Sequence, residues 1–129
     1  MIKHIKQPYC SSLCGQTCIA MLLGINLEKS IEEFNSRGGT RTKQLKEIIR
    51  KYGHDCTDKL KVVTKNTVIP EICICKVKWH GTNRSHWVLK HKDKLYDPEM
   101  ENCANWDDGY LHKPKHHGNW ISSYLEIWL

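Results

Sequence analysis

Cys14 has the surroundings of an activated thiol nucleophile. It falls in the first turn of a helix that apolar spacing predicts from about residue 12, and free N–H groups and the helix dipole favour a thiolate there. Gly15 leaves space for a substrate backbone to approach. A side-chain amide from Gln7, across a turn, and the backbone N–H of Cys14 would together form an oxyanion hole. This set of groups favours acyl transfer through a thiol.

His86 is the best placed base among the eight histidines. It opens the β-like run 86–89, and Asp97 ends the next run, 94–97. A tight polar link at 91–94 would make the two runs an antiparallel pair, which places the start of one beside the end of the next. Asp97 could then accept a hydrogen bond from a ring N–H of His86 and fix its tautomer.

Other residues compete for these roles. Cys10 precedes the helix and lacks a following glycine, and Cys18 lies one turn deeper on the same helix face, which is typical of core packing. His91 falls in the link between strands, and His80 precedes a glycine in a predicted loop. Cys14 and His86 are therefore favoured as nucleophile and base. Without His86 beside it, an aspartate before proline is often only a turn residue.

The predicted elements around these residues are helices first and strands second. Ser11-Ser12 can cap the helix of Cys14, and Ser30 with Glu33 fits the capping box of a short second helix. Thr40 or Thr42 caps a third helix. The apolar face of that third helix is formed by Leu45, Ile48, Ile49 and Tyr52. Glycines at 24, 38–39 and 53 end the three helices.

Short β-like runs follow in the second half of the chain. They lie at 62–63, 68–79, 87–89, 95–96 and 124–128, whereas 98–120 is predicted to be irregular. Helices followed by strands predict an α+β fold with one layer packed against the other. The length of 129 residues fits one domain, 1–129.

Composition argues against several other classes of protein. The chain has seven cysteines, an odd number, and shows no secretory signal. We therefore expect reduced thiols rather than a disulfide framework. The longest apolar run, 18–23, is far short of the ~20 residues that span a bilayer. We therefore expect a cytoplasmic chain with no signal peptide, no transmembrane segment and no membrane partner.

The sequence gives less support to a metal site or a nucleic-acid-binding surface. No Cys-x-x-Cys pair exists, Cys73 and Cys75 would share one face of a strand, and His112, His116 and His117 would bind metal only adventitiously. We expect no metal and no cofactor. The net charge of +6 is spread along the chain, so a solvated basic surface is favoured over a nucleic-acid site.

The ordered motifs resemble a known family. The segment QPYCSSLCGQTCIAML, the run His86-Trp87-Val88-Leu89 and the pair Asp97-Pro98 occur in the order seen in the bacteriocin-processing, double-glycine-leader cysteine peptidases. A middle helix between Gly39-Thr40 and Gly53 also fits. The chain departs from that family at Leu13, where an acidic residue is usual, and in a Gln7–Cys14 spacing that is one residue longer.

The resemblance implies a papain-like fold and a stand-alone cysteine peptidase acting on a peptide or protein. It implies the catalytic residues Cys14, His86 and Asp97, with Gln7 as the oxyanion residue. Three alternatives stay open: glutamine deamidation or acyl transfer on the same triad, a papain-like fold that only binds, and a Cys/His-rich basic module binding nucleic acid or protein. The sequence names neither the substrate nor the oligomeric state.

Overall fold

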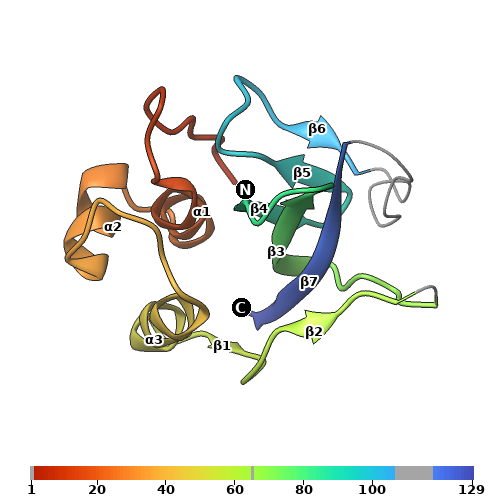
Figure 1. Cartoon of the computed structure of the whole chain (residues 1–129). Helices are drawn as coiled ribbons and strands as arrows, with labels where there is room; N and C mark the ends of the chain where they lie inside the picture. The colour runs from red at the N-terminus through yellow and green to blue at the C-terminus, as the bar shows by residue number, and fades with distance from the viewer. Residues whose placement is uncertain (1, 65, 107–117) are drawn as a thin grey trace.

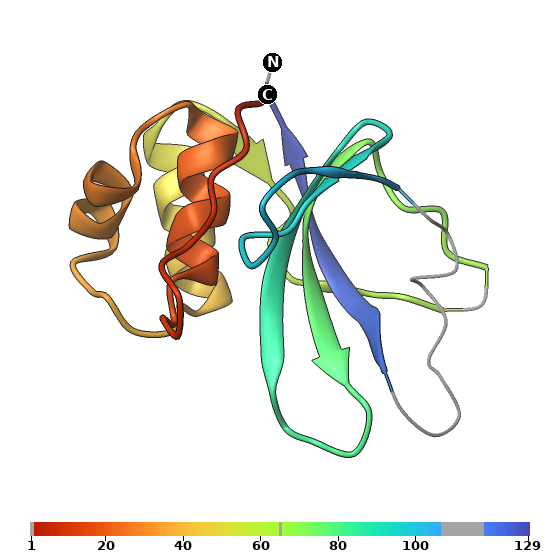
Figure 2. The same ribbon diagram turned by 90° about the horizontal axis from the view of Figure 1, so that it is seen from above.

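The computed structural model describes residues 2–64, 66–106 and 118–129. Helices pack on one face of an antiparallel sheet, and Figures 1 and 2 show the two layers from orthogonal directions. The predicted α+β class is confirmed. The helices are α1 (Cys14–Leu23), α2 (Leu27–Phe34) and α3 (Thr42–Lys51). The strands are β1 (Asp55–Cys56), β2 (Lys61–Val62), β3 (Ile72–Trp79), β4 (Ser85–His91), β5 (Lys94–Tyr96), β6 (Ala104–Asn105) and β7 (Asn119–Trp128).

Helix α1 ends as predicted but starts differently. Gly24 closes it in the left-handed region, with φ of 70°. The predicted serine cap is wrong, because the N-cap residue is Leu13 and no side chain caps the helix. The start is held instead by Thr17, whose N–H and Oγ1 both donate to the carbonyl of Leu13, at 2.9 and 2.7 Å.

Helix α2 begins earlier than the capping-box pattern predicts. Asn26 is the cap, and its Oδ1 accepts from the Lys29 N–H at 2.7 Å. Ser30 lies inside the helix, where its hydroxyl is buried and donates to the carbonyl of Gln16 at 2.6 Å. The helix ends at Asn35, in the left-handed region with φ of 52°, before the two glycines expected to close it. Ser30 therefore makes a contact between two helices and is not the cap that the sequence pattern predicted.

Helix α3 buries the predicted face. Leu45, Ile48 and Ile49 are all buried, as expected, whereas Tyr52, the fourth residue of that face, is the C-cap and only partly buried. The cap is Arg41 rather than either predicted threonine, and the Gln44 side chain accepts from the Arg41 N–H at 2.8 Å. The helix packs beside β1, the short strand that follows it.

The sheet order is β1-β7-β3-β4-β5-β6, and β2 pairs with β7 outside this path. Every described strand pair is antiparallel. The strand nearest the C-terminus, β7, lies between β1 and β3 (Figure 1). The hairpin of β3 and β4 pairs Val77 with His86, and β4 continues through a two-residue turn into β5.

The sheet buries apolar side chains on both faces. One cluster lies between the sheet and the helices, and Ile74 and Leu89 belong to it. The other contains Cys73 and Cys75, which share one face as predicted and bring their Sγ atoms to 3.5 Å. The contact with Cys73 and burial raise the pKa of the Cys75 thiol well above its usual value. Both thiols are fully buried and belong to the core.

All seven cysteines lie in the described ranges, and all are free thiols. In the described part of the chain, no helix has the length and apolar character needed to cross a membrane.

Candidate active site

Cys14 is the first residue of α1, so its backbone N–H has no acceptor within the helix. Its side chain is half-buried, whereas Cys18, one turn further, is fully buried. Burial, followed by the charges of Cys14 and Asp97, raises the pKa of the Cys18 thiol well above its usual value. The fold therefore exposes Cys14 at the helix start and keeps Cys18 as the core residue that the periodicity predicted.

Gly15 lets α1 approach the loop before α3. A Cβ built on Gly15 would lie 2.0 Å from Thr40 Oγ1. Thr40 therefore fills the space left by the missing side chain. The sequence had led us to expect this space to be open to a substrate backbone. Thr40 Oγ1 is buried and has no hydrogen-bond partner in the described part of the chain, and Thr40 lines the same cavity as Cys14.

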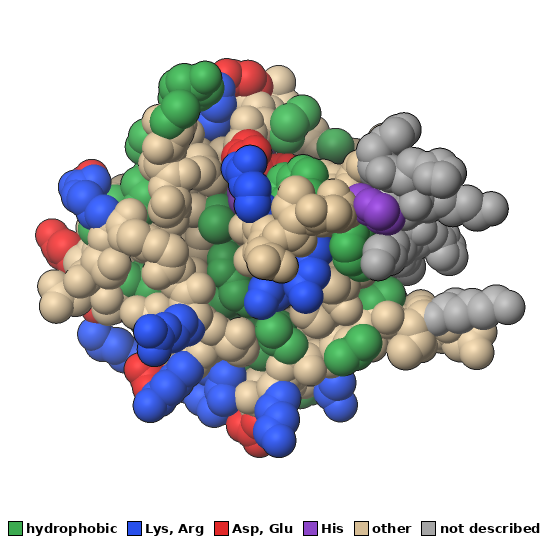
Figure 3. Space-filling model, in the orientation of Figure 1, with side chains coloured by type: hydrophobic (Ala, Val, Ile, Leu, Met, Phe, Trp, Pro, Cys, Tyr) green, Lys and Arg blue, Asp and Glu red, His purple; other side chains and the backbone are tan. Residues whose placement is uncertain are grey.

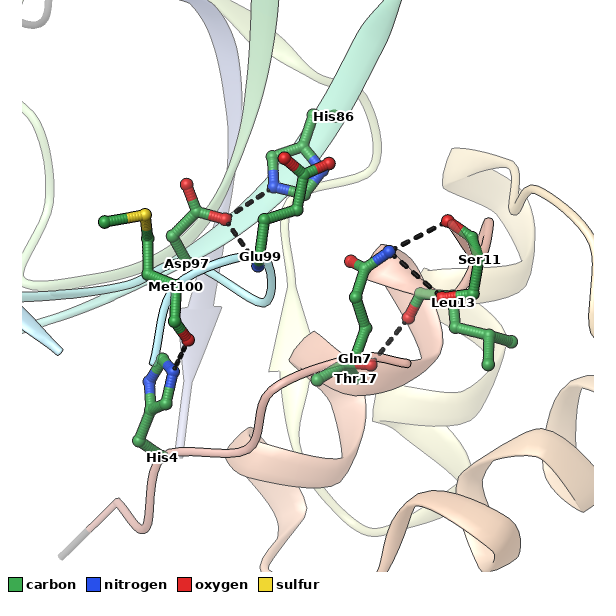
Figure 4. A network of polar contacts seen from close by, with 9 residues as sticks. All are labelled: His4, Gln7, Ser11, Leu13, Thr17, His86, Asp97, Glu99 and Met100. Atoms are coloured by element: carbon green, nitrogen blue, oxygen red, sulfur yellow. Dashed lines mark hydrogen bonds and ion pairs between the residues drawn. The ribbon is translucent and has the colours of Figure 1, made fainter. Parts of the chain in front are cut away.

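His86 and Asp97 are held side by side by neighbouring strands. His86 lies in β4 and is 5% exposed, and Asp97 directly follows β5. The turn between these strands is formed by Lys92 and Asp93, and Lys92 adopts a left-handed φ of 56°. His86 Nε2 donates to Asp97 Oδ1 at 2.6 Å, and the same oxygen accepts from the Glu99 N–H at 2.9 Å (Figure 4). The carboxylate is thus fixed from two sides.

The two neighbours of His86 decide where its proton sits. Burial alone would lower the pKa of His86, because a charged imidazolium loses hydration. Hydrogen bonds with Asp97 and Cys14, and the charges of both residues, outweigh burial and raise the pKa to about 10. Since Asp97 occupies Nε2, Nδ1 is the nitrogen left for Cys14. At neutral pH, His86 therefore holds a proton between a carboxylate and the thiol group.

A cavity of about 290 Å³ joins these groups. It lies between the start of α1, the loop before α3 and the turn end of the β3–β4 hairpin. Its lining includes Gln7, Ser11, Ser12, Cys14, Gly39, Thr40, Trp79, Arg84, Ser85, His86, Trp87 and Glu99. A larger cavity of about 530 Å³ shares Gln7, Ser11, Ser12, Arg84 and Glu99 with it, so the two form one continuous groove past Cys14.

Gln7 reaches this groove, but its amide is turned toward the neighbouring loop. Its backbone N–H donates to the carbonyl of Pro98 at 2.7 Å, which fixes the N-terminal segment beside Asp97. Its Nε2 donates to the carbonyl and hydroxyl of Ser11, at 2.9 and 3.2 Å (Figure 4). Its Oε1 is buried without a partner in the described ranges. An oxyanion role would require the amide to leave or share the Ser11 contact.

Three residues of the groove were not singled out from the sequence. Glu99 Oε1 lies 3.7 Å from His86 Nδ1. The ring of Trp79 lies 6.0 Å from the His86 ring, and the Arg84 guanidinium lies 5.6 Å from the Trp79 ring. One signal was available for Glu99. The β4–β5 register pairs Leu89 with Tyr96, and continuing it by counting places Glu99 opposite His86.

The remaining predicted competitors lie apart from this arrangement. Cys10 is exposed in a turn with φ of 56°, and it lines only the larger cavity. Within the described residues, no three His, Cys, Asp or Glu side chains are grouped so that they could hold a metal ion. His112, His116 and His117 lie outside the described residues.

Comparison with known proteins identifies the fold. No family model matches the chain, and no curated protein matches it. Among solved structures, a double-glycine motif protease from an AMS/PCAT transporter, in complex with the leader peptide, matches with a TM-score of 0.65 and 18% identity. The match covers 99% of this chain and 91% of that chain. The chain therefore has the α+β fold of papain-like proteases.

Proposed function

We propose that this protein is a cysteine peptidase that hydrolyses an amide bond in a peptide or protein through Cys14, His86 and Asp97. The observation that carries the proposal is the pair of partners on the His86 ring. Asp97 binds Nε2 at 2.6 Å, and the hydrogen bond with Cys14 helps to raise the pKa of His86 to about 10. The structural neighbour is a protease in complex with a leader peptide, which supports a peptide substrate for this chain.

The first half-reaction forms an acyl-enzyme. With its proton held on His86, the Cys14 thiolate attacks the amide carbonyl carbon, and the negative charge moves to the carbonyl oxygen. The free Cys14 N–H at the start of α1 stabilises that oxygen, together with the Gln7 amide if it turns from Ser11. His86 then donates its proton to the leaving nitrogen, the C–N bond breaks, and an amine departs.

The second half-reaction consumes water. The acyl group is now a thioester on Cys14, and neutral His86 takes a proton from a water molecule that attacks the thioester carbonyl. The C–S bond breaks, a carboxylic acid is released, and His86 again holds the proton. Asp97 keeps the imidazole oriented through both halves. Apart from the water, the proposed chemistry uses only groups of residues 1–129, acting as one catalytic domain with no metal or cofactor.

Selective alkylation tests the nucleophile. We expect iodoacetamide at pH 6 to label Cys14 more than about tenfold faster than Cys10 and Cys103, because ordinary exposed thiols are almost fully protonated there. Peptide mapping by mass spectrometry measures all three sites in one sample. Equal labelling of the three thiols would contradict an activated Cys14.

Turnover tests the reaction. A peptide library incubated with the protein should yield products with new N- and C-termini, read by mass spectrometry. Cys14→Ala and His86→Ala should each abolish cleavage, whereas Cys103→Ala, a change at an exposed thiol outside the groove, should leave it unchanged. Full cleavage by Cys14→Ala would refute the proposal.

A further inference from the structure

One charged side chain of the groove takes part in no ion pair among the described residues. Lys6 pairs with Glu101 at 2.5 Å. Glu99 lies 3.7 Å from Nδ1 of the protonated His86. Arg84 also lines both cavities, yet its guanidinium has no acidic partner among the ion pairs of the described residues. The groove therefore presents one cation that no ion pair of the described residues engages.

The unpaired guanidinium is oriented on an aromatic ring. Trp79 ends β3, and the Arg84 guanidinium lies 5.6 Å from its ring centroid, in a cation–π arrangement. The Arg84 backbone is held by its N–H donating to Thr82 Oγ1 at 3.2 Å. A guanidinium beside an aromatic ring keeps N–H groups that can bind a planar anion. The hairpin thus holds a planar cation at the groove, beside Trp79.

This cation is also close to the reacting groups. Trp79 lies 6.0 Å, ring to ring, from His86, so the order along the groove wall is His86, Trp79, Arg84. Many Lys and Arg side chains on the face shown in Figure 3 gather along its lower edge, over α3 and the region of β2. The exposed basic residues of those elements include Lys43, Arg50, Lys51, Lys59 and Lys61. Arg84 belongs to a different region, because it lies between β3 and β4 and lines the groove.

We propose that Arg84 is a specificity-determining residue that binds a carboxylate of the peptide substrate close to the scissile bond. This inference rests on the proposed peptidase function and deepens it. A carboxylate accepts two parallel hydrogen bonds from a guanidinium edge, and a neutral amide at the same place accepts fewer and carries no charge. The carboxylate belongs either to an Asp or Glu side chain or to the C-terminus of a short peptide, and the test separates these two sources.

The main experiment compares matched substrates. For each sequence that the wild-type protein cleaves in the library, peptides are made with Glu, Gln or Lys at each position near the cleaved bond, and with a free or amidated C-terminus. We expect one carboxylate to raise kcat/KM roughly tenfold or more over its amide. Arg84→Gln should abolish that preference, Arg84→Lys should keep part of it, and Lys61→Gln, which removes one exposed charge elsewhere, should leave it intact.

The two possible sources give different patterns. A preference for Glu at an internal position assigns an acidic side chain, and a preference for the free C-terminus assigns the terminal carboxylate. No charge preference in the wild-type protein overturns the inference. An equal loss of kcat/KM on Glu and Gln peptides in Arg84→Gln also overturns it, and in both cases the peptidase proposal stands.

A second measurement does not depend on peptide cleavage. Iodoacetate carries a carboxylate and iodoacetamide does not, so the ratio of their rates at Cys14 in low salt reports the nearby cation. Arg84→Gln should lower this ratio several-fold, and Lys61→Gln should not. An unchanged ratio in Arg84→Gln overturns the inference even if no peptide is cleaved. A lowered ratio without cleavage supports the anion site and counts against the peptidase.

Discussion

The imidazole of His86 has a different partner on each nitrogen. Nε2 is bound to Asp97, and Nδ1 lies on the side of Cys14 and Glu99. Burial works against a charged ring, yet the pKa is about 10, so the interactions with neighbouring groups exceed the loss of hydration. The chemistry proposed for Cys14 depends on the raised pKa of His86, and replacing one of its partners should shift that pKa in a known direction.

Asp97→Asn should shift the alkaline limb of the pH–rate profile. The carboxylate favours the protonated imidazole, so its loss lowers the pKa of His86, by about one unit or more. Above its pKa, His86 no longer stores the proton that the leaving amine requires. The fall of kcat/KM at high pH should therefore begin at lower pH in Asp97→Asn than in wild type, with reduced activity remaining at neutral pH. An alkaline limb at the wild-type pH would show that Asp97 does not set the protonation of His86.

Gln7→Ala tests whether the amide bound to Ser11 reaches the oxyanion. Removing a dedicated oxyanion donor costs about 10²- to 10³-fold in kcat. Because the Gln7 amide must first leave or share the Ser11 contact, we expect a smaller loss, roughly 10- to 100-fold in kcat with little change in KM. Steady-state kinetics on one library-derived peptide measures both constants. An unchanged kcat would leave the Cys14 N–H as the donor and assign Gln7 a purely structural role.

Residue type and order in the chain predicted Cys14, His86, Asp97 and Gln7 as site residues, and the structure brings all four to one region. The orientation of the Gln7 amide was beyond this reasoning, because Ser11 competes for it only once the turn between them has formed. Neither Trp79 nor Arg84 belongs to a recognisable sequence motif. The roles proposed for them depend on their positions at the end of the β3–β4 hairpin and on the absence of an ion pair at Arg84 within the described residues, which only the structure shows.

Helix α1 and the loop before α3 meet at a contact that tolerates only glycine. The Cβ of an alanine at position 15 would lie 2.0 Å from Thr40 Oγ1 and 3.0 Å from Thr40 Cβ and Cγ2. The loop is also tied to α1 by the buried Gln16, whose Nε2 donates to the carbonyls of Ser36 and Gly38 at 3.0 and 2.8 Å. Overpacking at this place must therefore move either the helix or the loop.

Gly15→Ala should destabilise the protein by about 1–3 kcal/mol. The strain comes from Thr40, so Thr40→Ala should recover part of the loss in the double variant, since it removes Oγ1 and Cγ2 but keeps Cβ. Urea unfolding of wild type, both single variants and the double variant forms the cycle. Additive effects would show that the two residues do not share the strain.

The local sequence pattern predicted the buried faces and ends of the helices better than their starts. The face of α3 and the end of α1 at Gly24 follow from periodicity and from glycine chemistry, and both are confirmed. The predicted start of α2 was wrong because the Ser30 hydroxyl donates to the Gln16 carbonyl in α1 instead of capping α2. A capping pattern in the sequence cannot reveal such a contact between helices. Strand β1 was missed because two residues are too short for an alternating pattern.

At the scale of the whole molecule, strand order and chain order differ. The last strand, β7, lies between β1 and β3, and pairs with β2 as well. Such long-range pairing depends on tertiary packing and leaves little local signal, so only the β4–β5 neighbours were predictable as a pair. The fold thereby closes around His86: β3 and β4 form its hairpin, β5 leads to Asp97, and the N-terminal segment binds Pro98 through the Gln7 N–H.

The protonation of His86 should make the stability of the whole fold depend on pH in one direction. In the unfolded chain the pKa returns to its usual value near 6.5, and in the folded chain it is about 10. A raised pKa stabilises the fold fully below about pH 6.5, and this contribution is lost as the pH rises through about 10. His86→Gln lacks this titration but keeps the lysines that ionise in the same range, so the difference between the two proteins isolates it. The difference in unfolding free energy, from urea titrations, should fall by roughly 2–4 kcal/mol between pH 6 and pH 10.5. A difference that stays constant or grows with pH would mean that His86 is neutral in the folded protein, and the ion pair proposed for catalysis would fall with it.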